Sequence, residues 1–482
     1  MNLFILIPIL FPVIAGFCLL ASGCEDNKKI HKAAIVSVCL NAIFVWACIL
    51  FAKDTSIEVT SFLDNFVLAF RLDGFSRIFA GMVSILWIFT TVYAFEYMHH
   101  EGMEKKFFSF FLVSFGVVMG IAFARNLFTM YMFYEYLTFA TLPLVMHQMS
   151  RKSRYAGVVY LAFSIFGGAL VFVAMMLLVR AGVSLEFVKG GMGVMDGNAD
   201  LIRWAFVAML MGFGVKSAIF PLHYWLPTAS VAPTPVTALL HAVAVVKSGV
   251  FAIGRAVYFV FGTAVLSGSF AQDIMMALAS FTIVYGSMQA LRTQHLKRRL
   301  AYSTVSNLSY IVFGLSVMTD GGLNGAAMHI LFHGVIKITL FFCVGAILYR
   351  TGAEYLNEIH GYGKRMPVIM ACYLVCGLGL IGVPPFAAFT SKYSMATAAI
   401  ASGNPMAYIG IAALIISEVL TAIYIFQPVM AAYFPKQDMI VEGGKQGDPG
   451  KLMTVPIAVL TAISVVLAVY PDWLIRLIGN LL

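Results

Sequence analysis

Long apolar stretches, separated by short clusters of charged residues, glycine or proline, make up most of the chain. Most are roughly 20 residues long, which is the length that a helix needs to cross a hydrocarbon core about 30 Å thick. They lack the strict alternation of half-buried strands, so we interpret them as helices. The pattern predicts about fourteen membrane spans, at residues 3–21, 33–52, 75–95, 107–123, 126–147, 155–180, 202–226, 234–258, 272–291, 300–318, 323–349, 367–400, 405–430 and 453–479.

Two connections are long enough to hold structure of their own. Residues 53–74 contain VTSFLDNFVLAFRLDG, whose alternation predicts a short hairpin on the membrane face. Residues 431–452 are polar and glycine-rich, which predicts a flexible loop. The N-terminal stretch has no basic segment and no A-x-A cleavage site, so we expect it to be a retained first span.

Composition excludes a soluble globular protein. Of the 482 residues, 61% are hydrophobic and 11% are charged, whereas soluble domains carry about 25% charged residues. The seven cysteines lie mostly within apolar runs and form no cluster with histidine at metal-ligand spacing, so we interpret them as small core residues. The predicted fold class is an all-α integral membrane protein.

The net charge of +9 requires no anionic binding partner, because the positions of the basic residues indicate how the chain is oriented in the membrane. Connections after odd-numbered spans hold 18 lysines and arginines, and those on the other side hold 9. Because basic residues accumulate on the cytoplasmic side, this bias predicts that both termini lie outside the cytoplasm.

The remaining four basic residues lie inside apolar spans. Each charged group at the centre of a membrane helix costs about 2.5–3.5 kcal/mol, so groups kept there face one another or a hydrated cavity, and a chain of them is typical of proton or cation transfer. The ionisable residues at membrane depth are the lysines Lys216, Lys247, Lys337 and Lys392, the acids Glu135 and Glu418, and the histidines His241, His329 and His333.

Glu135 and Lys216 are the favoured opposite-charge pair, since Glu135 is the sole acid of its span and Lys216 is the sole lysine of its span. Such a pair is a proton site if its partners can approach and withdraw, and a static buried ion pair is the alternative. On the predicted eighth span, His241 and Lys247 are six residues apart, so a continuous helix would separate them by about 120°. His241 alone could equally be a hydrogen-bonded packing residue.

The eleventh span carries one polar stripe. His329, His333 and Lys337 follow one another at four-residue steps, which places them on one helix face over about 12 Å. Three aligned ionisable groups in an apolar helix indicate a relay. Metal binding by the two histidines is the weaker alternative, because no carboxylate lies nearby in the sequence.

Proline and glycine interrupt two spans beside the buried lysines. Lys216 lies in GFGVKSAIFPLHYWLPTASVAPTPV, and Lys392 lies in GLGLIGVPPFAAFTSKYSM. Broken helices at matching positions of two halves indicate the ion site in transporters. Lys216 and Lys392 are 176 residues apart, while Lys247 and Glu418 are 171 apart. This offset predicts a repeat of spans 4–8 in spans 9–13, and an odd number of spans makes that repeat inverted.

Four motifs give a resemblance to a known family. KSAIFPLHYWLPTASVAPTPVTALLHAVAVVKSGVF, KRRLAYSTVSNLSYIVFG, HILFHGVIKITLFFCVGAI and GVPPFAAFTSK resemble the antiporter-like proton-translocating subunits shared by respiratory complex I, membrane-bound group 4 hydrogenases and Mrp-type cation/proton antiporters, over roughly residues 110–400. The resemblance implies fourteen helices, two inverted five-helix repeats, and broken seventh and twelfth helices. It also implies four segments: an N-terminal three-helix segment at 1–106, half-channels at 107–258 and 259–430, and a loop with a C-terminal helix at 431–482.

The resemblance also implies roles for the buried ionisable residues. Glu135 and Lys216 match the glutamate and lysine pair of the fifth and seventh helices, and Lys247 and His241 match the eighth-helix motif. His329, His333 and Lys337 match the eleventh-helix connection, and Lys392 matches the twelfth-helix lysine near the exit. Glu418 matches no motif position and remains an additional candidate.

The function implied is proton translocation by a non-catalytic subunit of a redox complex of the membrane-bound hydrogenase or NADH-quinone oxidoreductase type. We expect no cofactor in this chain, since it shows no cofactor motif. Iron–sulfur clusters, with nickel–iron or flavin centres, would belong to peripheral partner subunits, and sister antiporter-like subunits would lie beside it in a prokaryotic cytoplasmic membrane. The alternative is a subunit of a non-redox Mrp-type Na⁺/H⁺ antiporter.

Overall fold

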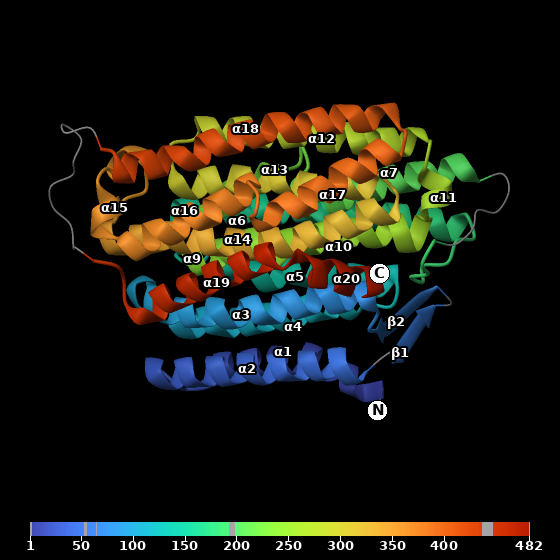
Figure 1. Ribbon diagram of the computed structural model, residues 1–482. Helices are drawn as coiled ribbons and strands as arrows, with labels where there is room; N and C mark the ends of the chain where they lie inside the picture. Colours follow the sequence, from blue (N-terminus) through green and yellow to red (C-terminus); the bar gives the residue numbers. More distant parts are fainter. Residues whose placement is uncertain (1, 53–54, 64, 192–197, 436–446, 482) are drawn as a thin grey trace.

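Nearly all of the described chain forms helices that lie side by side with their axes aligned. One β-hairpin lies at an end of this bundle (Figure 1). The computed structural model describes residues 2–52, 55–63, 65–191, 198–435 and 447–481. The first helical segment and the last helix both lie near the hairpin end (Figure 1), as an even number of spans requires. The predicted all-α membrane fold class is confirmed.

The first four long helices form one side of the bundle. Glycines allow the helices at residues 7–21 and 104–123 to approach closely. A Cβ atom on Gly16 would lie 2.6 Å from the Ser109 carbonyl oxygen, and a Cβ atom on Gly116 would lie 2.3 Å from the Ile9 carbonyl oxygen. Small residues at helix interfaces have this role in membrane proteins. These elements are η1 (Asn2–Leu6), α1 (Ile7–Ala21), α2 (Asn27–Phe51), α3 (Gly74–Glu101) and α4 (Glu104–Phe123).

The predicted hairpin is confirmed. Strands β1 (Ser56–Leu63) and β2 (Phe66–Arg71) pair antiparallel, with Ser56 opposite Arg71. The ring of Phe66 lies 5.1 Å from the ring of Phe128, so aromatic packing fixes the hairpin to the helix that carries Glu135.

The middle of the chain contains two interrupted spans. The predicted break in span 202–226 is confirmed, because helix ends at Lys216. The predicted span 234–258 is present, but its helix is interrupted, because Val243 departs from helical geometry and the Ala244 N–H bonds to the Leu239 carbonyl, five residues back. The elements are α5 (Leu127–Val145), α6 (Arg151–Arg180), α7 (Ala199–Lys216), α8 (Trp225–Thr228), η2 (Ala229–Val231), α9 (Thr234–Ala242), α10 (Val245–Arg255) and η3 (Ala256–Phe261).

The last part of the chain surrounds one long buried helix, α14 (Asp320–Thr351), which packs against α3, α9, α13, α16, α17 and α19. The loop predicted at 431–452 begins later than expected, since helix continues to Tyr433, and its centre at 436–446 lies outside the described residues. The other elements are α11 (Thr263–Leu266), α12 (Phe270–Arg292), α13 (Leu296–Ser316), η4 (Leu356–Glu358), α15 (Tyr362–Arg365), α16 (Pro367–Ile381), α17 (Ala387–Ala401), α18 (Pro405–Tyr433), α19 (Lys451–Val469) and α20 (Pro471–Leu481).

Each of the fourteen predicted ranges is occupied by helix, but the helices differ in apolar character. In the described part of the chain, ten are long and apolar enough to cross a membrane. The four remaining ranges hold α5, α7, the serine-rich α13 and the interrupted pair α16 and α17. Three of these four ranges carry Glu135, Lys216 or Lys392. The helices with the least apolar character therefore include those that carry residues of the candidate site.

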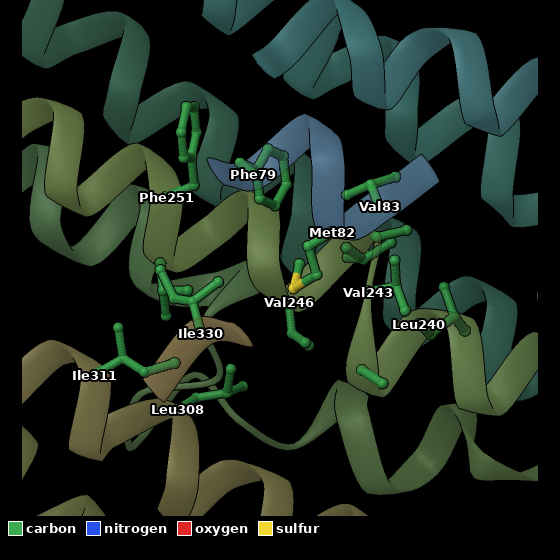
Figure 2. Packing of buried hydrophobic residues seen from close by; sticks show 14 of the residues in the cluster. Phe79, Met82, Val83, Leu240, Val243, Val246, Phe251, Leu308, Ile311 and Ile330 are labelled. Carbon is green, nitrogen blue, oxygen red and sulfur yellow. The ribbon is translucent and has the colours of Figure 1, made fainter. Parts of the chain in front are cut away.

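Apolar packing encloses the centre of the bundle. Figure 2 shows buried hydrophobic side chains from α3, α9, α10, α13 and α14 packed closely together. This packing keeps lipid and bulk water away from the interior charges, which strengthens electrostatic interactions among them. The labelled residues are Phe79, Met82, Val83, Leu240, Val243, Val246, Phe251, Leu308, Ile311 and Ile330.

Candidate functional site

Two buried lysines lie beside interrupted helices. Lys216 is the last residue of α7, and helix resumes only at Trp225. Lys392 belongs to α17, but its Nζ turns back to the break and donates to the carbonyls of Leu380 and Ile381 at 3.2 and 2.8 Å. These carbonyls lie at the C-terminal end of α16, where unpaired acceptors and the helix dipole favour a cation. The breaks therefore provide polar backbone for the lysines inside the membrane.

Glu135 and Lys216 both lie in the described part of the chain but form no ion pair within 4.0 Å. Lys216 Nζ donates to the Tyr134 carbonyl and lies 3.5 Å from the centre of the Tyr134 ring. Glu135 Oε1 has no hydrogen-bond partner in the described part, and its carboxylate lies against Gly168 of α6. The pair is open in this arrangement.

Lys247 contacts the histidine stripe of α14 directly. Its Nζ lies 2.8 Å from His333 Nδ1, within hydrogen-bond distance. The predicted stripe is present, because the His333 and His329 rings are 6.0 Å apart and only 25° from parallel. All three side chains are at most 1% exposed. The structure therefore brings together ionisable groups from two helices.

The row continues from the histidines to the second broken helix. His329 Nδ1 lies 2.9 Å from the Ser391 hydroxyl, and Ser391 precedes Lys392 in α17. Lys392 Nζ in turn lies 3.5 Å from Glu418 Oε1 on α18. Glu418, which had no assigned position in the sequence motifs, thus has Lys392 as its ion-pair partner. We call the set Lys247, His333, His329, Ser391, Lys392 and Glu418 the polar row.

Two further predicted residues lie beside this row. Lys337 donates to the Ser303 hydroxyl and, at 3.1 Å, to the Leu300 carbonyl, so it faces α13. His241 is buried 4.9 Å from the Phe341 ring, and neither of its nitrogens has a hydrogen-bond partner in the described part. The expected 120° between His241 and Lys247 does not apply, because α9 ends between them.

Buried hydroxyls are the part of the site that sequence reasoning missed. Ser417 Oγ lies within 2.6 to 3.1 Å of Ser287, Ser306 and the Tyr310 hydroxyl, which come from α12 and α13. The Tyr310 ring lies 5.0 Å from Lys392 Nζ and 5.5 Å from the His329 ring. The concentration of serines in STVSNLSY was the available signal, but single serines in membrane helices commonly bond to their own backbone.

The residue types in this arrangement are ones that can exchange protons. Lysine, imidazole, hydroxyl and carboxylate groups at hydrogen-bond or ion-pair distance can pass a proton with small side-chain movements. Within the described residues, no three His, Cys, Asp or Glu side chains are grouped so that they could hold a metal ion. Ser391 and Tyr310 join the predicted lysines and histidines as candidates.

The sequence is similar to those of known protein subunits. Residues 124–421 match the family described as NADH:quinone oxidoreductase/Mrp antiporter, TM. An NADH-quinone oxidoreductase subunit of Desulforudis audaxviator is 31% identical over 360 residues, which cover 73% of this chain and 70% of that protein. A Na(+)/H(+) antiporter subunit of Alkalihalophilus pseudofirmus is 26% identical over 473 residues, covering 97% and 94%.

The fold has a close solved counterpart. A chain in the structure of the membrane-bound sulfane sulfur reductase, an archaeal respiratory membrane complex, superposes with a TM-score of 0.87 at 21% identity. The match covers 100% of this chain and 97% of that one. The whole helical arrangement is therefore shared with a subunit of a multisubunit membrane complex.

Proposed function

Because the chain belongs to the NADH:quinone oxidoreductase/Mrp antiporter transmembrane family, we propose that it translocates protons as an antiporter-like subunit of a complex I-like redox complex. Glu135 and Lys216 would form one proton site, and Lys247, His329, His333, Lys337 and Lys392 the transfer path, with His241 beside it. Glu418 would be the terminal group. The chain would be non-catalytic in the redox reaction.

The observation that carries this proposal is the alignment of the polar row, in which three close contacts follow one another and the two histidine rings lie 6.0 Å apart. Lys247 and His333 are 2.8 Å apart, His329 and Ser391 are 2.9 Å apart, and the adjacent Lys392 lies 3.5 Å from Glu418. Each charge in the row is costly at membrane depth, and static packing does not require six polar groups in sequence. A transfer path explains why they are aligned.

Electrostatic coupling would link the two ends of the path. Unit charges 4 Å apart interact by about 4 kcal/mol at an effective dielectric constant near 20, so protonating one group changes proton occupancy at the next. The open Glu135 and Lys216 pair can then respond by closing or separating. The chain would transmit the state of one half to the other without a large helix movement.

A partly exposed carboxylate supports a location among other membrane subunits. Glu418 is 38% exposed at membrane depth, between Ile415 and Val419, which are each 59% exposed. A carboxylate facing lipid is unfavourable, so a neighbouring subunit would cover this face. We infer that sister antiporter-like subunits lie beside the chain and that iron–sulfur clusters, with nickel–iron or flavin centres, lie in peripheral partners.

The proposed setting is a prokaryotic cytoplasmic membrane with both termini on its outer side. The excess of lysine and arginine at the opposite end of the bundle supports this orientation. We also propose the segments 1–106, 107–258, 259–430 and 431–482 as the N-terminal helices, the two inverted half-channels and the C-terminal part. The matching breaks beside Lys216 and Lys392 support the two halves.

The direct test is to replace Glu135 or Lys216 by alanine in the intact complex and to measure proton uptake in inverted vesicles. We expect lost proton movement with normal subunit composition, while Glu58→Ala, on the exposed hairpin, should pump normally. Full pumping by Lys216→Ala would reject the proposed role. For Lys247→Met, failed assembly would indicate a structural function, and normal assembly without pumping would support transfer.

A Na⁺/H⁺ antiporter subunit is the second candidate. The antiporter subunit from Alkalihalophilus pseudofirmus matches 97% of this chain, a larger share than the oxidoreductase subunit matches. Mass spectrometry of the purified intact complex separates the two functions. Iron–sulfur and nickel-bearing subunits would support the redox complex, whereas small Mrp-type subunits without redox partners would support the antiporter.

A further inference from the structure

A small basic pocket lies apart from the polar row, beside the segment that follows the first broken helix. Its volume is about 240 Å³, and it lies between the first turns of α6 and α13 and the short elements α8 and η2. Two cations and three tyrosines dominate its wall. The lining includes Lys152, Tyr155, Tyr224, Thr228, Arg298 and Tyr302.

The two cations of this pocket are available for a ligand. Lys152 and Arg298 are both exposed, and neither forms an ion pair or side-chain hydrogen bond with the described residues. By contrast, the neighbouring Lys297 and Arg299 are buried and donate to protein carbonyls. The pocket therefore holds two positive charges that no carboxylate of the described chain pairs with within 4.0 Å.

The position of the pocket matches the boundary of a membrane. Tyr155 and Tyr224 are 56% and 48% exposed, and tyrosines gather at the level of lipid headgroups. Lys152 and Arg298 lie on the side predicted to be cytoplasmic, where anionic lipids attract clustered basic residues. The N-terminal ends of α6 and α13 add partial positive charge at the same place.

We propose that this pocket binds the phosphate headgroup of an anionic phospholipid of the cytoplasmic leaflet. Lys152 and Arg298 would neutralise the phosphate, and the tyrosine hydroxyls would donate hydrogen bonds to its oxygens. Because α8 and η2 form one wall, the bound lipid would hold the segment that follows Lys216 against α6 and α13. The site lies outside the proton path and is independent of which ions the subunit moves.

The test is photo-crosslinking in nanodiscs that contain the intact complex and a phosphatidylglycerol analogue with a photoreactive group near its headgroup. Peptide mass spectrometry should find labelled peptides around Tyr155, Tyr224 and Tyr302. The double variant Lys152→Gln/Arg298→Gln should bind about thirtyfold more weakly, from the usual contribution of two basic residues near a membrane. Lys29→Gln is the matched control, because Lys29 is an exposed cation in the first turn of α2.

Four results would overturn the proposal. The first two are equal labelling by a phosphatidylcholine analogue and unchanged labelling in the double variant. Loss of labelling in millimolar inorganic phosphate would indicate that the pocket binds a soluble anion. Labelling only after partner subunits are removed would indicate that the pocket is part of a subunit interface. Arg298→Lys, which keeps the charge, should retain most of the labelling and thereby separates charge from folding.

Discussion

Lys247 and His333 share a hydrogen bond of 2.8 Å although they are 86 residues apart in the sequence. When the lysine is protonated it donates to His333 Nδ1, so the imidazole must carry its own proton on Nε2. Transfer of the lysine proton to Nδ1 leaves His333 able to release the Nε2 proton on the other side of its ring. The pair can therefore pass a proton from α10 to α14 without moving either helix.

The first prediction concerns His333. His333→Ala should slow proton translocation by at least about tenfold, because relay by a positioned acid or base is worth 10²–10⁴-fold in rate. Proton uptake by vesicles that hold the intact complex is the measurement. His223→Ala is the control, since His223 is also buried (6% exposed) but takes no part in the polar row. Wild-type uptake in the His333 variant would exclude this route.

The second prediction uses the glycine behind Glu135. A Cβ at Gly168 would lie 2.4 Å from Glu135 Oε1, so Gly168→Ala must displace the carboxylate. We expect proton uptake to fall by about tenfold or more while the complex assembles normally, since misplacing a reacting group by 1 Å can cost 10²-fold in rate.

Gly81→Ala is the matched control for this steric test. Its new Cβ would meet nothing closer than Ile49 Cδ1 at 3.6 Å, which is ordinary contact. Both variants place alanine in a buried region of a long helix, so general effects of the substitution cancel. Equal uptake in the two variants would show that the position of Glu135 does not matter.

The third prediction tests Ser391 as the link between His329 and Lys392. Ser391→Ala removes the hydroxyl that lies 2.9 Å from His329 Nδ1 and should slow proton uptake by about tenfold. Ser391→Thr keeps a hydroxyl and should restore most of the rate. Ser394→Ala, one turn away in α17, should have little effect. A slow threonine variant together with a normal alanine variant would contradict the relay.

The helices and most charged members of the site could be predicted because their signals are local. Proline and glycine mark the breaks near Lys216 and Lys392, and four-residue spacing puts His329 and His333 on one face. The break at Val243 and Ala244 could not be predicted, because neither residue is a helix breaker. It changed the expected relation of His241 and Lys247, because the helix does not run continuously between them.

Contacts between helices were the second part that sequence could not supply. Serines in α12, α13 and α18 look alike in sequence, and only packing selects Ser417 as the centre of a hydroxyl cluster. Three cations counted with the connections, Arg255, Lys297 and Arg299, are in fact buried. Without them, the connections after odd-numbered spans hold 16 lysines and arginines and those on the other side hold 8. The two-to-one ratio, and with it the predicted orientation, is unchanged.

Arg255 provides the last prediction, because it forms a two-point ion pair with Asp73 in which the arginine is fully buried and the aspartate is 23% exposed. Its two terminal nitrogens donate to the two Asp73 oxygens at 2.6 Å each, and one also donates to Ser76 at 2.8 Å. Burial alone would raise the pKa of Asp73, but the charge and hydrogen bonds of Arg255, with those of Ser76, lower that pKa well below its usual range. The pair joins α3 to α10 beside the hairpin.

A carboxylate with a lowered pKa stabilises the fold at every pH above its unfolded value of about 3.9, and that contribution is lost as the pH falls toward the folded value. Removing one partner at neutral pH leaves a buried charge, so Asp73→Asn should destabilise by about 3–5 kcal/mol. Asp200→Asn is the control, because Asp200 is 80% exposed in its pair with Arg203 and should cost less than about 1 kcal/mol. Thermal unfolding of the detergent-purified complex measures both. Equal midpoints for the two variants would mean that Arg255 finds another partner.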